Sequence, residues 1–492
     1  MLATSASAEA ANIVTELGSP GTQAWRNACP GPQNAPTGGG EKLTSCTPGT
    51  PGCMHRVDID TSIFPNAVCS DGTPGAFYIR EGQGVDDHNR WVIHLQGGGR
   101  AQSYADVEAR WCGTQGGLPY NAAKMSSDWN GDGNTDLFDH ATVPGMTASS
   151  PDNEFENWNH VFVYYCSSDA WQGTRSNVLF SEGANDVRID ARGHTILAVV
   201  RRMLRKRGAA AAWTAVGGET LPDLDSATDV ILSGTSAGAR GALNNADWFF
   251  TPLPSIERSL VMDGNMDVSD TVLLSNNIWL DDDNDGVGDS NYYSGRIGQE
   301  LDEWGPGGYL NKIGAFADQS CRSIYNPLGR MDRCSIMSTV LRLNYGVAPL
   351  IETPTFVRVD LDDPVLSKGW SQHPNPLGFS LLAGGASGTP TTAADFRALT
   401  RATLVQLFDD QDTVTGVIGP RDSRHVGLES ARAFGCTVVR DTTDTAPFGI
   451  VGGTAATVHD ALWEWLNLGG PRLPGRRLDR PVGGDVTFIS CP

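Results

Sequence analysis

The chain has 492 residues, which is enough to bury one large sheet together with insertions. It carries 36 basic and 57 acidic residues, a formal net charge of −21, and nucleic acid or an anionic membrane surface would repel such a protein. No run of 18 apolar residues occurs, so the sequence predicts no membrane span.

Ten cysteines indicate an oxidised protein. Their even count, with no C-x-x-C pair, argues against zinc ribbons and thioredoxin chemistry and favours up to five disulfides, whose pairing stays open. We expect residues 1–70 to form an extension packed on the main domain, because this Pro- and Gly-rich segment has little apolar sequence for a core of its own. Four of the cysteines lie in it: Cys29, Cys46, Cys53 and Cys69. The first residues lack an apolar signal core, so we expect a secreted protein whose signal peptide has been removed.

Trp91–Gly99 is an apolar strand that ends in three glycines. Glycine is the residue expected where backbone N–H groups must approach a ligand closely, because it has no side chain to block the approach. The amides of Gly97 and Gly98 are therefore candidates for binding an oxyanion. A phosphate-binding loop is disfavoured, because neither G-x-x-x-x-G-K-[ST] nor G-x-G-x-x-G follows.

Two Asp-rich loops follow the spacing of calcium-binding loops, in which alternate oxygen donors converge on one cation and a glycine at position 6 permits the sharp turn. The ligands expected are Asp128, Asn130, Asp132, Asn134 and Asp136 in the first loop, and Asp281, Asp283, Asp285, Val287 and Asp289 in the second. Position 12 is Asp139 or Tyr292, so neither loop has the usual bidentate glutamate. We expect two structural calcium sites, with ordinary surface turns as the alternative.

The apolar run that begins at Asp229 ends in Gly234–Gly238, and Ala237–Phe250 continues as a helix. A G-x-S-x-G turn between a strand and a helix lifts a serine hydroxyl clear of the backbone, where a base can activate it. Ser236 is therefore the candidate nucleophile. The amide of Ala237 completes the predicted oxyanion hole with Gly97 and Gly98.

The acid and the base should follow the serine in chain order. The strand pattern Thr353–Val359 leads into Asp360–Asp363, a helical stretch follows, and a second strand pattern leads to a loop with His425. We expect Asp363 as the acid, with Asp362 as its rival, and His425 as the base. His459 is the rival base, but it lies within a predicted amphipathic helix, where a histidine more often packs.

Four segments together resemble the pectin acetylesterase/Notum family of carboxylesterases: Leu95–Gly99, Tyr165–Gly173, Arg192–Val200 and Gly234–Gly238. The resemblance runs from about Tyr78 to Leu468. It implies an α/β-hydrolase fold, a Ser-Asp-His triad at Ser236, Asp363 and His425, and removal of an acyl group from a glycan or a protein-linked alcohol. Arg100 stands where the family usually has an aromatic residue, so the resemblance does not predict the acyl pocket of this chain. Pro364–Leu366 stands where the family usually has Trp-Gln, which leaves open whether Asp362 or Asp363 is the acid.

We therefore expect a mostly parallel central sheet flanked by helices, in a catalytic domain of residues 71–475 with insertions at about 125–150 and 275–295, and a tail of residues 476–492. The expected activity is hydrolysis of a small acyl ester, such as acetyl, on a polysaccharide such as pectin, by a monomer that needs no cofactor for catalysis. The alternatives are a lipid or polyester esterase with a larger acyl pocket and a non-catalytic, calcium-stabilised glycan-binding protein.

Overall fold

The computed structural model describes part of the chain, and every structural statement below concerns that part. The described residues are 14–16, 43–83, 87, 89–111, 122–128, 134–148, 153–183, 185–205, 223–251, 257–263, 304–329, 331, 334, 340–341, 350–363, 397, 401, 404, 408, 414–421, 424, 426–430, 434–435, 437–439, 456–466, 475–478 and 487–488.

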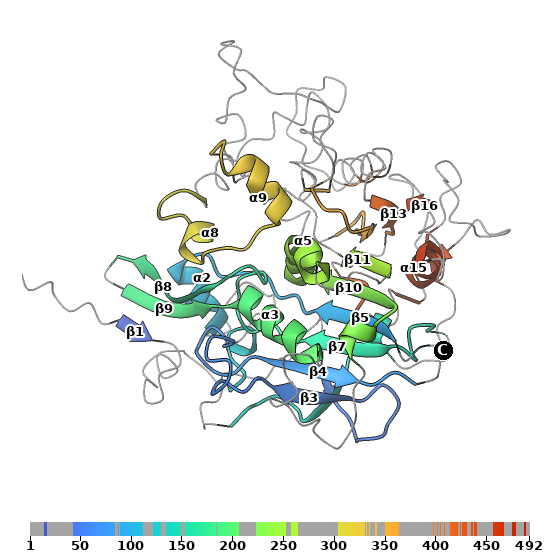
Figure 1. Ribbon diagram of the computed structural model, residues 1–492, viewed down its shortest axis with the longest axis horizontal. Helices are drawn as coiled ribbons and strands as arrows, with labels where there is room; N and C mark the ends of the chain where they lie inside the picture. The colour runs from blue at the N-terminus through green and yellow to red at the C-terminus, as the bar shows by residue number, and fades with distance from the viewer. Residues whose placement is uncertain are drawn as a thin grey trace, which may run out of the picture.

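The centre of the molecule is an 11-stranded sheet with the order β16-β13-β12-β11-β10-β5-β7-β4-β3-β6-β2 (Figure 1). The strands from β16 to β7 pair in parallel, and β4, β3, β6 and β2 continue the sheet antiparallel. Their bounds are β2 Thr44–Ser45, β3 Met54–Asp58, β4 Ala76–Arg80, β5 Arg90–Leu95, β6 His140–Thr142, β7 Asn159–Val163, β10 Asp229–Thr235, β11 Glu257–Asp263, β12 Thr355–Arg358, β13 Val414–Gly419 and β16 Gly475–Leu478.

Helices cover both faces of this sheet. Strands β7 and β10 are buried along their whole length, as a parallel sheet covered on both faces requires. Side chains alternate between faces along a strand. Val230 and Leu232 share a core with α3 (Gly193–Leu204) and α5 (Ala237–Phe250), whereas Ile231 packs in another core with α15 (Val458–Leu466). The three layers confirm the expected α/β fold with a mostly parallel sheet.

Smaller elements surround the central sheet. One three-stranded sheet consists of β1 (Val14–Glu16), β9 (Asn185–Ala191) and β8 (Arg175–Glu182), and another of β15 (Ala456–Thr457), β14 (Thr437–Val439) and β17 (Thr487–Phe488). The remaining helices are α2 (Tyr104–Trp111), α8 (Tyr309–Lys312) and α9 (Gln319–Tyr325), with short 3₁₀ turns η1 (Ala122–Lys124), η2 (Gly145–Thr147) and η3 (Leu224–Ser226). None of the described helices is both long and apolar enough to cross a membrane.

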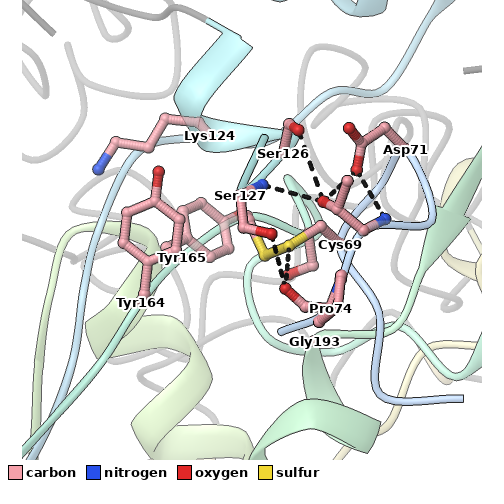
Figure 2. The surroundings of a disulfide bond; sticks show 12 residues. Cys69, Asp71, Pro74, Lys124, Ser126, Ser127, Tyr164, Tyr165 and Gly193 are labelled. Atoms are coloured by element: carbon pink, nitrogen blue, oxygen red, sulfur yellow. Dashed lines mark hydrogen bonds between the residues drawn. A yellow bond between two sulfur atoms is a disulfide. The ribbon is translucent and has the colours of Figure 1, made fainter. Parts of the chain in front are cut away.

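Three disulfides join described cysteines: Cys46–Cys53, Cys69–Cys166 and Cys321–Cys334. The second links the turn before β4 to the end of β7. Ser127 Oγ donates to the carbonyl oxygen of Pro74 beside it, at 2.9 Å (Figure 2). These disulfides agree with an oxidising compartment.

The sheet extends beyond the expected limits of the catalytic domain at both ends. β2 and β3 lie within the expected N-terminal extension, and both are strands of this sheet. In the expected tail, β16 pairs with β13 and β17 pairs with β14. The physical reason is that these short strands gain their backbone hydrogen bonds from strands distant in sequence.

Candidate active site

Ser236 lies at a strained turn between β10 and α5. Its backbone has φ 52° and ψ −120°, a left-handed conformation that is costly for any residue with a Cβ. A Cβ on Gly234 would lie 2.3 Å from the carbonyl carbon of Gly238, and one on Gly238 would lie 2.0 Å from the carbonyl oxygen of Leu95. Both glycines are therefore required for the close approach of β10, α5 and β5. The local geometry is that of a nucleophile elbow.

The glycine loop after β5 lies next to this turn, because Leu95 pairs with Gly234 in the parallel register of β5 and β10. Trp171 Nε1 donates to the carbonyl oxygen of Gln96 at 2.9 Å, and Lys124 Nζ donates to that of Gly97 at 3.2 Å. Each peptide group is planar, so holding a carbonyl also fixes the direction of the next N–H. These two contacts therefore orient the amides of Gly97 and Gly98.

The next two carbonyls of the loop are held in the same way. The buried Arg110 donates from Nη1 to the carbonyl oxygen of Gly98 at 2.8 Å, and the Tyr165 hydroxyl donates to that of Gly99 at 2.7 Å. Burial raises the pKa of Tyr165 well above its usual range, so the hydroxyl keeps its proton near neutral pH. The loop is thus fixed by donors from several elements.

Asp169 organises the segment that carries Tyr165 and Trp171. Its carboxylate accepts hydrogen bonds from the amides of Trp171, Gly173 and Gly193 at 2.7–3.1 Å and from the Ser167 hydroxyl at 2.6 Å. Burial raises the pKa of Asp169 to about 6, although these hydrogen bonds act in the opposite direction. The bonds stabilise a backbone in which three non-glycine residues close to the aspartate, Ser168, Ala170 and Trp171, have positive φ.

The two candidate acids differ in their surroundings. Asp362 forms ion pairs with Arg397 and, at 3.1 Å, with Arg421. Asp363 is fully buried. Both follow β12, and the backbone N–H of Asp362 donates to the buried carboxylate of Asp360 at 2.8 Å.

His425 lies outside the described residues, so its relation to Ser236 and Asp363 stays a prediction. The described residues on either side of it are anchored. Arg358 Nη1 donates to the carbonyl oxygen of Arg424 at 3.1 Å, and the Leu428 carbonyl oxygen accepts from the Met146 amide at 2.7 Å. The strands that precede these residues, β10, β12 and β13, are parallel strands of one sheet, so their carboxyl ends lie along one edge.

The rival base, His459, is the second residue of α15 and is buried. It forms an ion pair with Glu154 and packs against the rings of Phe155 and Phe434, with ring centroids 6.1 and 5.2 Å away. The His459 ring therefore packs against aromatic side chains, as expected for a histidine within an amphipathic helix.

Comparison with known proteins agrees with this geometry. Residues 54–266 match the pectinacetylesterase family model. The chain is 28% identical over 203 residues to palmitoleoyl-protein carboxylesterase notum1a of Danio rerio, covering 40% of this chain and 33% of that protein. It is 28% identical over 208 residues to pectin acetylesterase 7 of Arabidopsis thaliana, covering 41% and 43% of the two chains. The chain thus matches less than half of the length of these relatives.

The fold extends over more of the molecule than the sequence similarity. The structure of the Wnt deacylase Notum from Drosophila superimposes with a TM-score of 0.54 at 19% identity, covering 87% of this chain and 96% of that chain. This shows a Notum-like α/β-hydrolase fold. In sequence, the chain is similar to pectin acetylesterases and to Notum carboxylesterases.

The sequence alone missed the donors that hold the glycine loop. Tyr165 and Trp171 lie in a segment that pointed to the pectinacetylesterase family, so a signal for them existed. The sequence carried no signal for Arg110 or Lys124. Each is a single basic residue, one on a helix and one on a 3₁₀ turn, and such residues look like ordinary surface charges.

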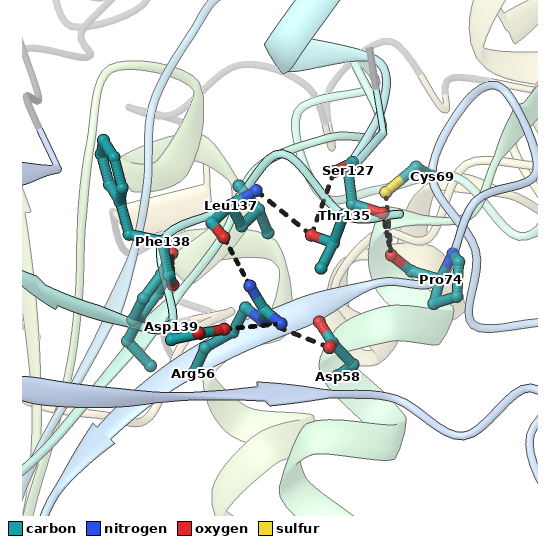
Figure 3. Close-up of polar contacts among 10 residues, drawn as sticks. Arg56, Asp58, Cys69, Pro74, Ser127, Thr135, Leu137, Phe138 and Asp139 are labelled. Atoms are coloured by element: carbon teal, nitrogen blue, oxygen red, sulfur yellow. Dashed lines mark hydrogen bonds and ion pairs between the residues drawn. The ribbon is translucent and has the colours of Figure 1, made fainter. Parts of the chain in front are cut away.

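The first Asp-rich loop is described only at its ends. The amide of Asp136 donates to the carbonyl oxygen of Ser127 at 2.8 Å, which closes the base of the loop. Asp139, at position 12, forms an ion pair with Arg56 at 3.1 Å, and Arg56 also pairs with Asp58 (Figure 3). Asn130 and Asp132, and all the ligands expected in the second loop, lie outside the described residues. Among residues that are described, no group of three or more His, Cys, Asp or Glu could hold a metal ion.

Proposed function

We propose that the chain is a secreted serine carboxylesterase that removes a small acyl group, such as acetyl, from a polysaccharide such as pectin. The observation that carries this proposal is the elbow: Ser236 has φ 52° at the end of β10, next to a glycine loop whose carbonyls are all held. A strained serine beside aligned N–H groups is the arrangement that acyl transfer requires.

The proposed reaction has two steps. Ser236 Oγ attacks the ester carbonyl carbon while His425 takes the hydroxyl proton, and the amides of Gly97, Gly98 and Ala237 stabilise the oxyanion. His425 then donates this proton to the departing sugar oxygen, which leaves an acyl-enzyme. Water attacks the acyl-enzyme through the same base and releases the carboxylic acid and the free serine.

Asp363 is the proposed acid, holding His425 in the productive tautomer. Its burial supports this role, because a carboxylate that orients the base acts best away from water. Asp362 is less suited, because two arginines already occupy its carboxylate.

The polysaccharide substrate is supported by the pectin acetylesterases among the relatives and by Arg100. Arg100 follows the glycine loop and is partly exposed, with its guanidinium 5.3 Å from the centre of the Tyr309 ring. A cation there can pair with the carboxylate of a uronate. The Notum carboxylesterases match with similar identity and are named for a palmitoleoyl group, which keeps a lipid esterase with a larger acyl pocket as the second candidate.

We also propose that calcium stabilises the two Asp-rich loops without taking part in catalysis. The first loop is closed at its base by the bond between Asp136 and Ser127, which brings its two ends together. Carboxylates that converged at one site in this loop would repel one another unless a cation neutralised them. Asp139 is not a proposed ligand, because it pairs with Arg56.

The test of the activity is a panel of p-nitrophenyl esters from acetate to palmitate, together with acetylated pectin and acetylated xylan. We expect turnover of acetate and release of acetate from pectin, both lost by at least about 10³-fold in Ser236→Ala. Faster turnover of palmitate would favour the lipid esterase. A wild-type protein that binds glycans and hydrolyses none of these esters would favour the non-catalytic alternative.

A further inference from the structure

A chain of buried side chains lies next to the elbow. His94 of β5 contacts the hydroxyl of Ser233 on β10 through Nδ1 at 2.8 Å. Its other ring nitrogen, Nε2, lies 2.6 Å from Glu429 Oε1, and the Thr235 hydroxyl donates to the same oxygen. His94 and Glu429 are 1% and 5% exposed, so this network is closed to solvent.

The order serine, histidine, glutamate resembles a catalytic triad, but this group cannot act as one. Ser233 has no exposed surface and lies within β10, where an ester carbonyl cannot reach its hydroxyl. The network therefore has another role.

The hydrogen bonds define how the group is held. An ionised Glu429 can only accept, so His94 must donate to it from Nε2. His94 Nδ1 then accepts from the Ser233 hydroxyl when the ring is neutral. When the ring is protonated, Nδ1 donates to Ser233, whose hydroxyl can donate to the carbonyl oxygen of Ile93 at 3.4 Å. Both ring nitrogens of His94 and the hydroxyls of Ser233 and Thr235 therefore have a partner in either state.

The location of the network connects two parts of the proposed site. Thr235 immediately precedes Ser236, and Glu429 follows His425 by four residues. His94, Ser233 and Thr235 all point to the face of the sheet that α15 covers, because they alternate in step with Val92 and Ile231. Four residues of chain span at most about 14 Å, so Glu429 limits how far His425 can move from the elbow.

We propose that His94 and Glu429 are positioning residues, which fix the segment that contains His425 against β10, the strand that leads to Ser236. The inference rests on the proposed function. Near its start, the same segment is held at the Arg424 carbonyl by Arg358, so the residues on both sides of His425 are anchored. A displacement of about 1 Å in a catalytic base can lower the rate by about 10²-fold.

The first experiment compares two amides at His94. The side-chain nitrogen of glutamine can replace Nε2 and keep the bond to Glu429, whereas asparagine can replace only Nδ1 and keeps the bond to Ser233. Both bury a polar amide, so their structural cost is similar. We expect His94→Asn to lower kcat for p-nitrophenyl acetate by about 10²-fold with KM within about threefold of wild type. His94→Gln should recover most of this loss. Equal kcat values for the two folded variants would overturn the proposal.

The second experiment needs no change at His94. Glu429→Gln keeps the size of the side chain and removes its charge. Glu154→Gln does the same to a more exposed glutamate that pairs with the buried His459. We expect Glu429→Gln to lower kcat and the rate at which a fluorophosphonate labels Ser236, each by about tenfold or more, while Glu154→Gln changes neither. Variants that differ only in melting temperature would reduce Glu429 to a structural role. A wild-type protein that neither hydrolyses esters nor reacts with the fluorophosphonate would instead refute the proposed function.

Discussion

A side-chain carbon on Gly238 would lie 2.0 Å from the carbonyl oxygen of Leu95, so the first turn of α5 fits against the end of β5 only if this residue is glycine. The contact joins the helix that follows the nucleophile to the strand that precedes the glycine loop. Ser236 and the loop are thereby held in one rigid unit.

Gly238→Ala should therefore disrupt both stability and activity. We expect a loss of about 3 kcal/mol in the free energy of unfolding, because the neighbouring atom belongs to the backbone and cannot rotate away. Urea denaturation and ester turnover measure the two effects. Gly435→Ala is the control, since no atom lies within 4 Å of a Cβ at Gly435, and its free energy should change by less than about 1 kcal/mol. Equal stability of the two variants would contradict the packing argument.

The two histidines should differ in their effect on the reaction. His425→Ala should lower kcat as far as Ser236→Ala, because members of a triad act together and their losses do not add. His459→Ala should lower the melting temperature and leave kcat within about threefold, because His459 packs between Phe155 and Phe434. The reverse result would make His459 the base.

The two aspartates allow a matched comparison. Asp363→Asn should lower kcat by about 10³-fold or more, since an amide would hold the histidine in the wrong tautomer. Asp362→Asn should mainly weaken the ion pairs with Arg397 and Arg421, a cost of about 1 kcal/mol in stability. Steady-state kinetics beside thermal melts distinguish the two. A larger loss of kcat in Asp362→Asn would assign the acid to Asp362.

Removal of calcium should act on stability before activity. A cation bound only by the folded state adds about 2.7 kcal/mol at 100 times its dissociation constant, so EDTA should lower the melting temperature and activity should fall only as the protein unfolds. Asp132→Ala and Asp285→Ala should each remove part of this shift. Asp139→Asn should leave it unchanged, because Asp139 pairs with Arg56. The same melting temperature with and without EDTA would return both loops to ordinary turns.

His194 should make the fold sensitive to acid. Burial lowers its pKa to about 4, with a smaller opposing effect from its hydrogen bond to Asn245. The unfolded chain therefore binds the proton first, near pH 6.5. The stability that a neutral His194 contributes is complete above that pH and is lost as the pH falls toward 4, by about 1.4 kcal/mol per pH unit. Urea midpoints at pH 7, 6 and 5 should fall less steeply in His194→Gln than in wild type. Parallel slopes would show that His194 does not titrate in this range.

The local parts of the site could be predicted from the sequence. The predicted strand, turn and helix around Ser236 correspond to β10, the turn after it and α5. They could be predicted because the apolar pattern and the glycines at 234 and 238 determine structure over only a few residues. The glycine loop after β5 could be predicted for the same reason, because it follows directly from an apolar strand and three adjacent glycines. The strands before the candidate acid and base also appear, as β12 and β13.

Only the tertiary structure decided what holds these parts together. It placed β2 and β3 in the central sheet, and it brought Lys124 and Arg110 to the carbonyls of Gly97 and Gly98. His94 and Glu429 are 335 residues apart in sequence and meet at 2.6 Å. Such contacts leave no periodic pattern, because each depends on where two distant segments are folded and not on the residues beside them. The sequence therefore determined the candidate nucleophile, and the fold decided which buried side chains keep it in place.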